Sequence, residues 1–377
     1  MPAFPGISVA GQSVPASIFA RLREHLARFP GDVIPFQIGD THLPPAVGLD
    51  AFDWASLPAA DLYTYGTPAG WAPLVDAIVA KVRRKNAIEI TGAQVQVTAG
   101  ATHALACAVQ ALCNPGDELI LLTPHWPLIR GIALGHNVAP IEVAGVAAIE
   151  AAITPRTAGV YVASPNNPDG AMLSPADVAE IARIAAARDL WIFSDEVYED
   201  HVYDGAHVSV APRAPERTIT VFSCSKSYAQ AGLRVGYVVG PEPVLAAVRK
   251  LANHSVFNVP VAMQRAACAA LLGGDSFLAN ARARYQAARD RARARLVAPA
   301  ALPPGAAYLW VDFGAWCDGD GGDCMPVLER IAAAGVLCAP GSAFGDACGR
   351  HARLCFTGVD EARLDEGIDR INRVLRA

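Results

Sequence analysis

One stretch decides how the rest of the sequence is interpreted, namely Ser223-Cys224-Ser225-Lys226 followed by Ala231-Gly232-Leu233-Arg234-Val235-Gly236-Tyr237. It comes directly after residues 218–222, an apolar run that predicts a strand, so Lys226 would emerge just past the carboxyl end of a strand. Open α/β sheets bind ligands at that edge. A lysine with a lowered pKa can form a Schiff base, and hydroxyls, glycine backbone and a guanidinium can bind phosphate. The stretch therefore suits a phosphorylated carbonyl compound.

Around this stretch, short apolar runs alternate with amphipathic ones. Strands are expected at residues 95–98, 118–122, 158–163, 191–194, 218–222 and 235–240, and helices at 74–84, 102–112 and 175–188. Such alternation predicts an α/β fold with a mostly parallel sheet covered by helices on both faces.

The pattern changes at both ends of the chain. Residues 1–45 are rich in Pro and Gly, with one helical stretch at 17–28, and predict an arm. After residue 275 come a long Arg/Ala helix, strands at 308–313, 336–338 and 353–356, and a final helix. We therefore expect an N-terminal arm over 1–45 that joins the small domain, a large domain over 46–275, and a smaller α+β domain over 276–377.

Composition narrows the functional classes. The 377 residues are 53% hydrophobic and 18% charged with a net charge of −5, as expected for a compact protein with a large core. Scattered Lys and Arg argue against nucleic-acid binding, and no apolar run is long enough for a membrane span. The N-terminus lacks a secretory pattern, so a cytoplasmic location is expected. Nine single cysteines without metal-ligand spacing predict reduced thiols and no metal site.

Further motifs upstream of Lys226 carry polar residues at predicted strand ends. Asp195 and Tyr198 lie in Ile192-Phe193-Ser194-Asp195-Glu196-Val197-Tyr198, and Asn167 lies in the turn Ser164-Pro165-Asn166-Asn167-Pro168-Asp169-Gly170. Val97-Thr98-Ala99-Gly100-Ala101-Thr102 joins a strand to a helix, whose free N–H groups attract anions. Trp126 follows another strand in Thr123-Pro124-His125-Trp126-Pro127.

In this order and register, the motifs resemble the class I/II aminotransferases, the aspartate-aminotransferase-like enzymes of fold type I that use pyridoxal 5'-phosphate (PLP). The matches run from about Gly39 to Phe356 and so cover nearly the whole chain. Asp169 stands where the family more often has Thr, a departure that leaves Asn167 in register. Each motif taken alone also has a plain structural reading, as a turn, a helix N-cap or a core residue.

The resemblance implies a role for each matching residue at the cofactor. Lys226 would hold PLP as a Schiff base, Asp195 would keep the ring nitrogen protonated, and Tyr198 and Asn167 would hydrogen-bond the ring oxygen. The remaining implied cofactor contacts are Gly100, Ala101, Thr102, Ser223, Ser225 and Arg234 around the phosphate and Trp126 stacked on the ring.

The resemblance also implies substrate and subunit contacts. Arg353, in Arg353-Leu354-Cys355-Phe356, would grip the substrate α-carboxylate, with Gly39 and Asn167 close by. Tyr65 would reach the phosphate held by a neighbouring subunit, which predicts a homodimer with shared sites. Tyr63 competes for that role, but the distance to Gly70 favours Tyr65.

The expected reaction moves an amino group from an L-amino acid to a 2-oxo acid by ping-pong kinetics, with Lys226 as the general base. A PLP-dependent lyase, such as one catalysing C–S β-elimination, or an oxidase would use the same fold. A non-catalytic ligand sensor is a further alternative, although the chain shows no added DNA-binding module.

Substrate choice is less constrained by the sequence. No second arginine suited to a dicarboxylate is evident, and residues 254–258 offer mostly neutral contacts, which favours neutral or aromatic substrates over aspartate. The Gly/Asp-rich stretch 318–323 lacks the distal glutamate of a calcium loop and predicts a surface loop. Cys224 is interpreted as a buried packing residue.

Overall fold

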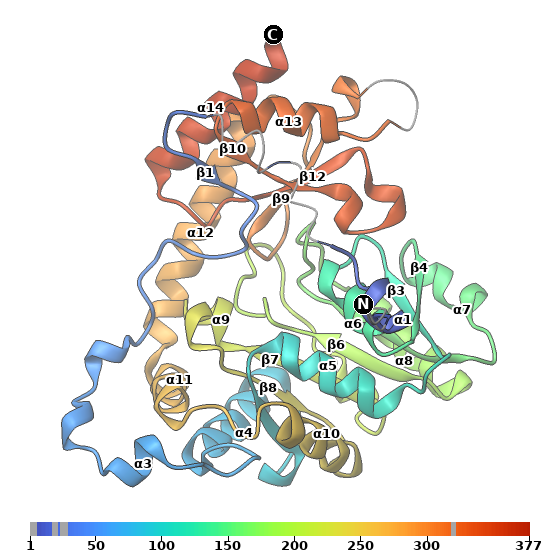
Figure 1. Ribbon diagram of the computed structural model, residues 1–377, viewed down its shortest axis with the longest axis vertical. Coiled ribbons are helices and arrows are strands. Elements are labelled where there is room, and N and C mark those ends of the chain that lie inside the picture. Colours follow the sequence, from blue (N-terminus) through green and yellow to red (C-terminus); the bar gives the residue numbers. More distant parts are fainter. Residues whose placement is uncertain (1–5, 17–21, 23–28, 318–321) are drawn as a thin grey trace, which may run out of the picture.

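A computed structural model describes residues 6–16, 22, 29–317 and 322–377 (Figure 1). The helix predicted at 17–28 lies outside the described residues apart from Leu22, and so does most of the loop predicted at 318–323. Within the described part, no helix combines the length and apolar character that a bilayer crossing would need.

A seven-stranded sheet forms the centre of the larger part of the molecule. Its strand order is β2-β8-β7-β6-β5-β3-β4, and β7, β6, β5, β3 and β4 run parallel while β8 is antiparallel to both of its neighbours. The strands are β2 (Val95–Thr98), β3 (Glu118–Leu122), β4 (Ala139–Val143), β5 (Thr157–Ala163), β6 (Trp191–Asp195), β7 (Thr218–Ser223) and β8 (Gly236–Val239). The predicted α/β fold with a mostly parallel sheet is confirmed.

Helices cover both faces of this sheet. Leu119 and Leu121 pack with α5, α6 and α10, whereas Ile120 between them packs with α8, because successive strand residues point to opposite faces. The longer helices here are α4 (Ala72–Asn86), α5 (Ala101–Leu112), α6 (Pro127–Gly135), α8 (Pro175–Arg188), α10 (Glu242–Ser255) and α11 (Val261–Gly273). The shorter helices are α1 (Val9–Ser13), α3 (Ala59–Tyr63), α7 (Ile149–Ala152) and α9 (Cys224–Ser227).

The rest of the chain forms a second layered unit above the sheet in Figure 1. It contains α12 (Asp275–Arg295), β9 (Tyr308–Asp312), α13 (Met325–Ala333), β10 (Val336–Leu337), β11 (Ala339–Pro340), β12 (His351–Cys355) and α14 (Glu361–Arg376). Strands β11, β12 and β9 form an antiparallel sheet, and β1 (Ile34–Pro35) pairs with β10. Ile34 and Phe36 share one apolar core with this unit. The domain boundaries at 45 and 275 stay predictions.

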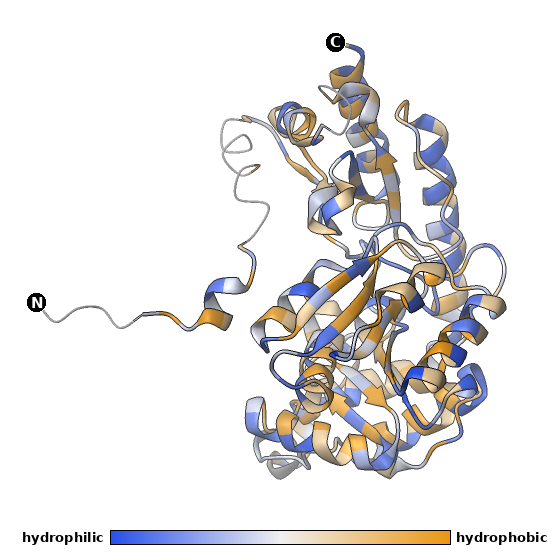
Figure 2. Cartoon of the chain, turned by 90° about the vertical axis from the view of Figure 1, so that its right-hand side faces the viewer, coloured by the Kyte–Doolittle hydropathy of each residue, from blue (hydrophilic) through white to orange (hydrophobic). Residues whose placement is uncertain are grey.

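The N-terminal helix α1 lies against α6, where the Ser13 hydroxyl donates to the Leu134 carbonyl at 3.4 Å. Figure 2 shows α1 at the side of the larger unit, with apolar residues on its surface. Val9 in this helix and Ile7 and Val14 beside it are exposed.

Candidate active site

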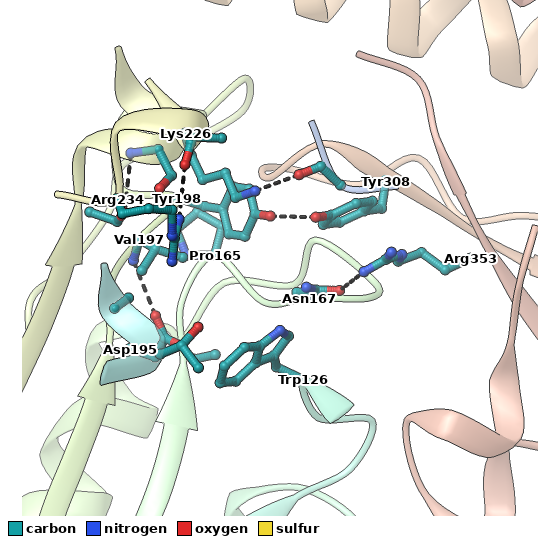
Figure 3. A pocket seen from close by; sticks show the side chains of 17 residues that line it. Trp126, Pro165, Asn167, Asp195, Val197, Tyr198, Lys226, Arg234, Tyr308 and Arg353 are labelled. Carbon is teal, nitrogen blue, oxygen red and sulfur yellow. Dashed lines mark hydrogen bonds between the residues drawn. The ribbon is translucent and has the colours of Figure 1, made fainter. Parts of the chain in front are cut away.

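A cavity of about 240 Å³ opens where β5, β6 and β7 end, beside the start of α5, and side chains of β9 and β12 line it at the right of Figure 3. This is the edge at which parallel sheets bind ligands. Twelve of the predicted site residues line it: Gly39, Ala101, Thr102, Trp126, Asn167, Asp195, Tyr198, Ser223, Ser225, Lys226, Arg234 and Arg353. The fold therefore brings into one cavity residues that are spread over most of the sequence.

Lys226 reaches the cavity from the one-turn helix α9, which begins directly after β7. Ser223 caps this helix, since its hydroxyl accepts a hydrogen bond of 3.1 Å from the Ser225 N–H. The Lys226 ammonium donates to the carbonyl oxygen of Gly39. Burial lowers the pKa of Lys226, which favours the neutral amine that nucleophilic and base chemistry require.

Asp195 is the last residue of β6 and lies at the floor of the cavity. Its carboxylate accepts a hydrogen bond of 2.8 Å from the Tyr161 hydroxyl, and Figure 3 shows the Trp126 ring beside it. Burial raises the pKa of Asp195 to about 6, because a buried carboxylate loses its hydration. A cationic group placed against this carboxyl would stabilise its ionised form.

An anion cradle forms where Gly100 meets Arg234. Gly100 precedes α5 with φ 80°, and a Cβ built on it would lie 2.4 Å from the Arg234 Nη2 atom. Arg234 donates to the carbonyls of Ala231 at 2.9 Å and Ala99 at 3.4 Å, which fixes its guanidinium beside the first N–H groups of α5. Helix N–H groups and a guanidinium together suit a phosphate.

The opposite end of the cavity holds Arg353, a buried residue of β12. Its Nη1 donates to the Asn167 side-chain oxygen at 2.7 Å and its Nη2 to the Gln37 carbonyl at 2.6 Å. The buried Nε has no hydrogen-bond partner among the described residues. A guanidinium held in this way suits a carboxylate of a ligand.

Tyr308 lines the same cavity and is not predicted from the sequence. A tyrosine at the start of a predicted strand gives no signal that separates a site residue from a core residue. Its hydroxyl contacts that of Tyr198. The other unpredicted lining residues are Ala163, Pro165, Val197 and Ala231.

Two predicted site residues do not line the cavity directly. Gly100 contributes through its backbone, against Arg234. Tyr65 lies outside, 83% exposed, with its ring 4.5 Å from that of Phe257, and Tyr63 is 85% exposed. The role of Tyr65 in a second subunit stays a prediction.

Cys224 is buried and does not line the cavity, and burial raises its pKa to about 12. Because the thiolate is the nucleophilic form, a thiol that is so rarely ionised is a packing group and not a nucleophile. Elsewhere in the described part of the chain, the ligand atoms of Glu196, Glu199 and His207 lie within 4.8 Å of one another. Protein donors, including Ser209 and Lys81, already contact these carboxylates.

Comparison with known proteins decides the family. A family profile described as aminotransferase class I and II matches residues 36–371. The chain belongs to this family. It is therefore a PLP-dependent aminotransferase, as the motifs predict.

Among relatives of this aminotransferase, a probable aspartate/prephenate aminotransferase of Thermus aquaticus is 33% identical, with 83% of this chain and 84% of the relative covered. An arginine–pyruvate transaminase of Pseudomonas aeruginosa is 35% identical over 77% of each chain. Among solved structures, a Thermus thermophilus aspartate aminotransferase mutant has a TM-score of 0.91 at 29% identity, covering 98% of this chain and 100% of that one. Nothing in these names favours the lyase, oxidase or sensor alternatives.

The residues of the cavity fit PLP. Gly100 and Gly236 leave the space beside Arg234 free of side chains, since a Cβ on Gly236 would lie 2.7 Å from the Gly100 carbonyl carbon. The buried Asp195 carboxyl offers a partner for a protonated ring nitrogen, and Lys226 offers the amine. The cavity thus offers a suitable group to the phosphate, to the ring nitrogen and to the aldehyde of PLP.

Proposed function

We propose that this aminotransferase transfers an amino group from an L-amino acid to a 2-oxo acid by ping-pong kinetics, with Lys226 as the covalent anchor of PLP and as the proton carrier. The observation that carries the proposal is the single cavity shared by Lys226, Asp195, Arg234 and Arg353. PLP, when bound, supplies an electron sink for the charge left on the substrate Cα.

The cofactor is held at three points. Arg234, the start of α5 and the Ser223 and Ser225 hydroxyls bind the phosphate, with Gly100 and Thr102 in the same turn. Asp195 would pair with the ring nitrogen, and such an ion pair would favour the ionised carboxylate that burial alone disfavours. Trp126 would contact the ring, and Tyr198 and Asn167 would donate to its oxygen.

Lys226 carries the proton transfer. Its amine must be neutral to accept a proton from the substrate Cα, and burial lowers its pKa toward that state. The Gly39 carbonyl accepts its hydrogen bond and so fixes the direction of the side chain.

The substrate carboxylate binds Arg353. The guanidinium is already oriented by Asn167 and Gln37, so little side-chain entropy is lost when a ligand arrives. The described residues that line the cavity contain three Lys or Arg side chains, at 226, 234 and 353, and each has a role in this scheme. We therefore propose neutral or aromatic amino acids as preferred substrates over aspartate.

We further propose a homodimer with shared sites and a cytoplasmic location. The dimer is supported by the exposed aromatic pair Tyr65 and Phe257, since exposed apolar patches mark interaction surfaces. The location is supported by the cysteines, since no disulfide forms among the described residues.

The test is the visible absorption of the purified protein with PLP, mixed with single amino acids in the absence of any oxo acid. A band lost in Lys226→Ala but kept in Lys250→Ala, a variant of an exposed lysine on α10, supports the anchor. Transamination is shown by bleaching with an amino acid and recovery with an oxo acid. Release of ammonia or pyruvate during bleaching would contradict it.

The same panel tests substrate preference. Faster bleaching by aromatic or neutral amino acids than by aspartate is expected. The reverse order would show that a cation outside this chain's cavity binds a second carboxylate.

A further inference from the structure

Tyr308 lies between the two ends of the cavity. It is the first residue of β9, is 1% exposed, and projects between the cofactor side and the Arg353 side (Figure 3). Neither its position in the sequence nor the resemblance to the family assigns it a role. Its hydroxyl contacts Tyr198, and its ring contacts Arg353.

The hydroxyl half contacts Tyr198. The two phenol oxygens are hydrogen-bonded, and the rings meet edge to face at 5.6 Å with an interplanar angle of 77°. If Tyr198 donates its proton to the cofactor ring oxygen, its own oxygen is left as an acceptor. Tyr308 is the donor placed to satisfy it, and a hydrogen bond received strengthens a hydrogen bond given.

The ring half contacts Arg353. The guanidinium carbon lies 4.3 Å from the Tyr308 ring centroid and 5.1 Å from that of Phe344. A guanidinium that lies over an aromatic face is attracted to the π-electrons of the ring. This attraction holds the guanidinium over that face. The ring therefore orients the group that receives the substrate carboxylate.

Gly39 fixes the hydroxyl end of Tyr308. A Cβ on Gly39 would lie 2.0 Å from the Tyr308 Oη, so only glycine allows this approach. The carbonyl of the same glycine accepts the hydrogen bond of Lys226. Tyr308 is thus held at the backbone segment that also positions the lysine.

We propose that Tyr308 is a positioning residue with two separable actions, one through its hydroxyl on Tyr198 and one through its ring on Arg353. The proposal rests on the function proposed above, because it assumes that Tyr198 meets the cofactor and Arg353 the carboxylate. Tyr308 itself forms no bond to the reacting atoms.

The hydroxyl action is tested in Tyr308→Phe, which keeps the ring. The measurement is the pH at which the visible absorption of the substrate-free holoenzyme changes. Donation from Tyr198 favours the form in which the ring oxygen carries unshared negative charge, so weaker donation raises this pH. We expect a rise of up to about one pH unit, as one lost hydrogen bond allows, and a larger rise in Tyr198→Phe.

The ring action is tested in Tyr308→Met, which has a similar volume but no ring. The affinity of the holoenzyme for a non-reactive carboxylate analogue of an amino acid should fall about 3- to 30-fold in this variant. In Tyr308→Phe it should change less than about 2-fold. Tyr203→Phe is the control, because it removes the hydroxyl of a partly buried tyrosine that donates to the Ala306 carbonyl outside the cavity. This variant should leave both readouts unchanged.

The outcomes separate this inference from the proposed function. An unchanged spectral pH in Tyr308→Phe, or equal carboxylate affinities in the Phe and Met variants, would overturn the two-action role while the aminotransferase scheme stands. A wild-type protein that shows no visible band even after PLP is added would overturn both. Since Tyr308→Phe changes one atom, it keeps the hydroxyl test decisive even if the Met variant fails to fold.

Discussion

Arg353 and Asn167 are joined by a hydrogen bond of 2.7 Å that spans 186 residues of sequence. The guanidinium donates to the amide oxygen, so the amide nitrogen of Asn167 is left free to donate toward the cavity. One buried amide thus connects the proposed carboxylate site to the proposed cofactor ring oxygen. On the proposed roles of these two residues, a single side chain would couple substrate binding to cofactor orientation.

The Arg353 guanidinium predicts a strong effect of Arg353→Lys. A lysine cannot donate to Asn167 and Gln37 while also presenting two parallel donors to a carboxylate. We expect kcat/KM for the preferred amino acid to fall about 10²- to 10³-fold, the cost of removing one partner from a buried charge pair. Steady-state kinetics measure this directly.

Arg183→Lys is the matched control, because Arg183 lies on the exposed face of α8 and pairs with Glu150 and Glu180 far from the cavity. Its kcat/KM should stay within about 2-fold of wild type, as expected for a surface ion pair. Equal losses in the two variants would show that Arg353 supports the fold and not the carboxylate.

Gly100 predicts a loss of PLP affinity in Gly100→Ala. The added Cβ would lie 2.4 Å from the Arg234 Nη2, and φ 80° with ψ 171° is a conformation that essentially only glycine adopts. We expect PLP to bind at least about tenfold more weakly, since strain of about 1–3 kcal/mol would be relieved by moving the cradle. Fluorescence titration of the cofactor-free protein measures the affinity.

Gly232→Ala tests whether the effect is specific to that position. Gly232 is exposed in the same loop region as Arg234, and no atom lies within 4 Å of the position that an added Cβ would take. PLP affinity should be unchanged. A comparable loss in both variants would place the cause in loop flexibility and not in the cradle.

The sequence predicts the sheet and most of the site because these depend on local patterns. Buried strands read as apolar runs, and the ends of β6 and β7 carry Asp195 and Ser223 at positions that the register alone brings to one edge. The edge strand β4 is missed, since it is only partly buried and carries Pro140, so its hydrophobic signal is weak.

Tyr308 shows what local patterns cannot give. Its contact to Tyr198 arises from the packing of the second unit over the sheet, and its contact to Arg353 arises from the pairing of β9 with β12. Neither partner is near Tyr308 in sequence. The exposed Tyr65 is the opposite case, because its predicted partner lies on another chain. A sequence motif identifies Tyr65 but gives no signal for Tyr308, and the contacts of both residues depend on tertiary or quaternary packing.

Asp195 predicts a pH dependence of the cofactor-free protein. Its pKa of about 6 in the folded state exceeds the ordinary value of 3.8, so between these values the folded state binds more protons than the unfolded state. The contribution of this group to stability must then fall as pH rises from about 4 to 6, by at most about 3 kcal/mol. Urea unfolding at pH 4.5 and pH 7 measures the difference.

In Asp195→Asn this contribution disappears, because the amide does not titrate. The variant should lose less stability than wild type between the two pH values. It should also bind PLP more weakly, since the ring nitrogen loses its carboxylate. A wild-type protein and a variant with the same pH dependence would contradict the raised pKa.

The proposed role of Tyr65 predicts that the inactive variants Tyr65→Ala and Lys226→Ala regain activity when their subunits are mixed. If Tyr65 acts at the neighbouring subunit's site, a dimer of one Tyr65→Ala subunit and one Lys226→Ala subunit contains one site with both residues intact. Random reassociation of a two-fold dimer makes half of the dimers mixed, each with one of its two sites restored. We expect about a quarter of wild-type activity after refolding or exchange, measured against each variant alone.

Tyr63→Ala distinguishes the two tyrosines. Both are more than 80% exposed and lie two residues apart, so they have equal access to a second subunit. If Tyr65 is the shared residue, Tyr63→Ala alone retains most of its activity, and only the Tyr65 variant needs complementation. If mixing Tyr65→Ala with Lys226→Ala restores nothing while both proteins are dimeric, each site is complete within one chain, and the exposed Tyr65–Phe257 pair serves only contact between subunits.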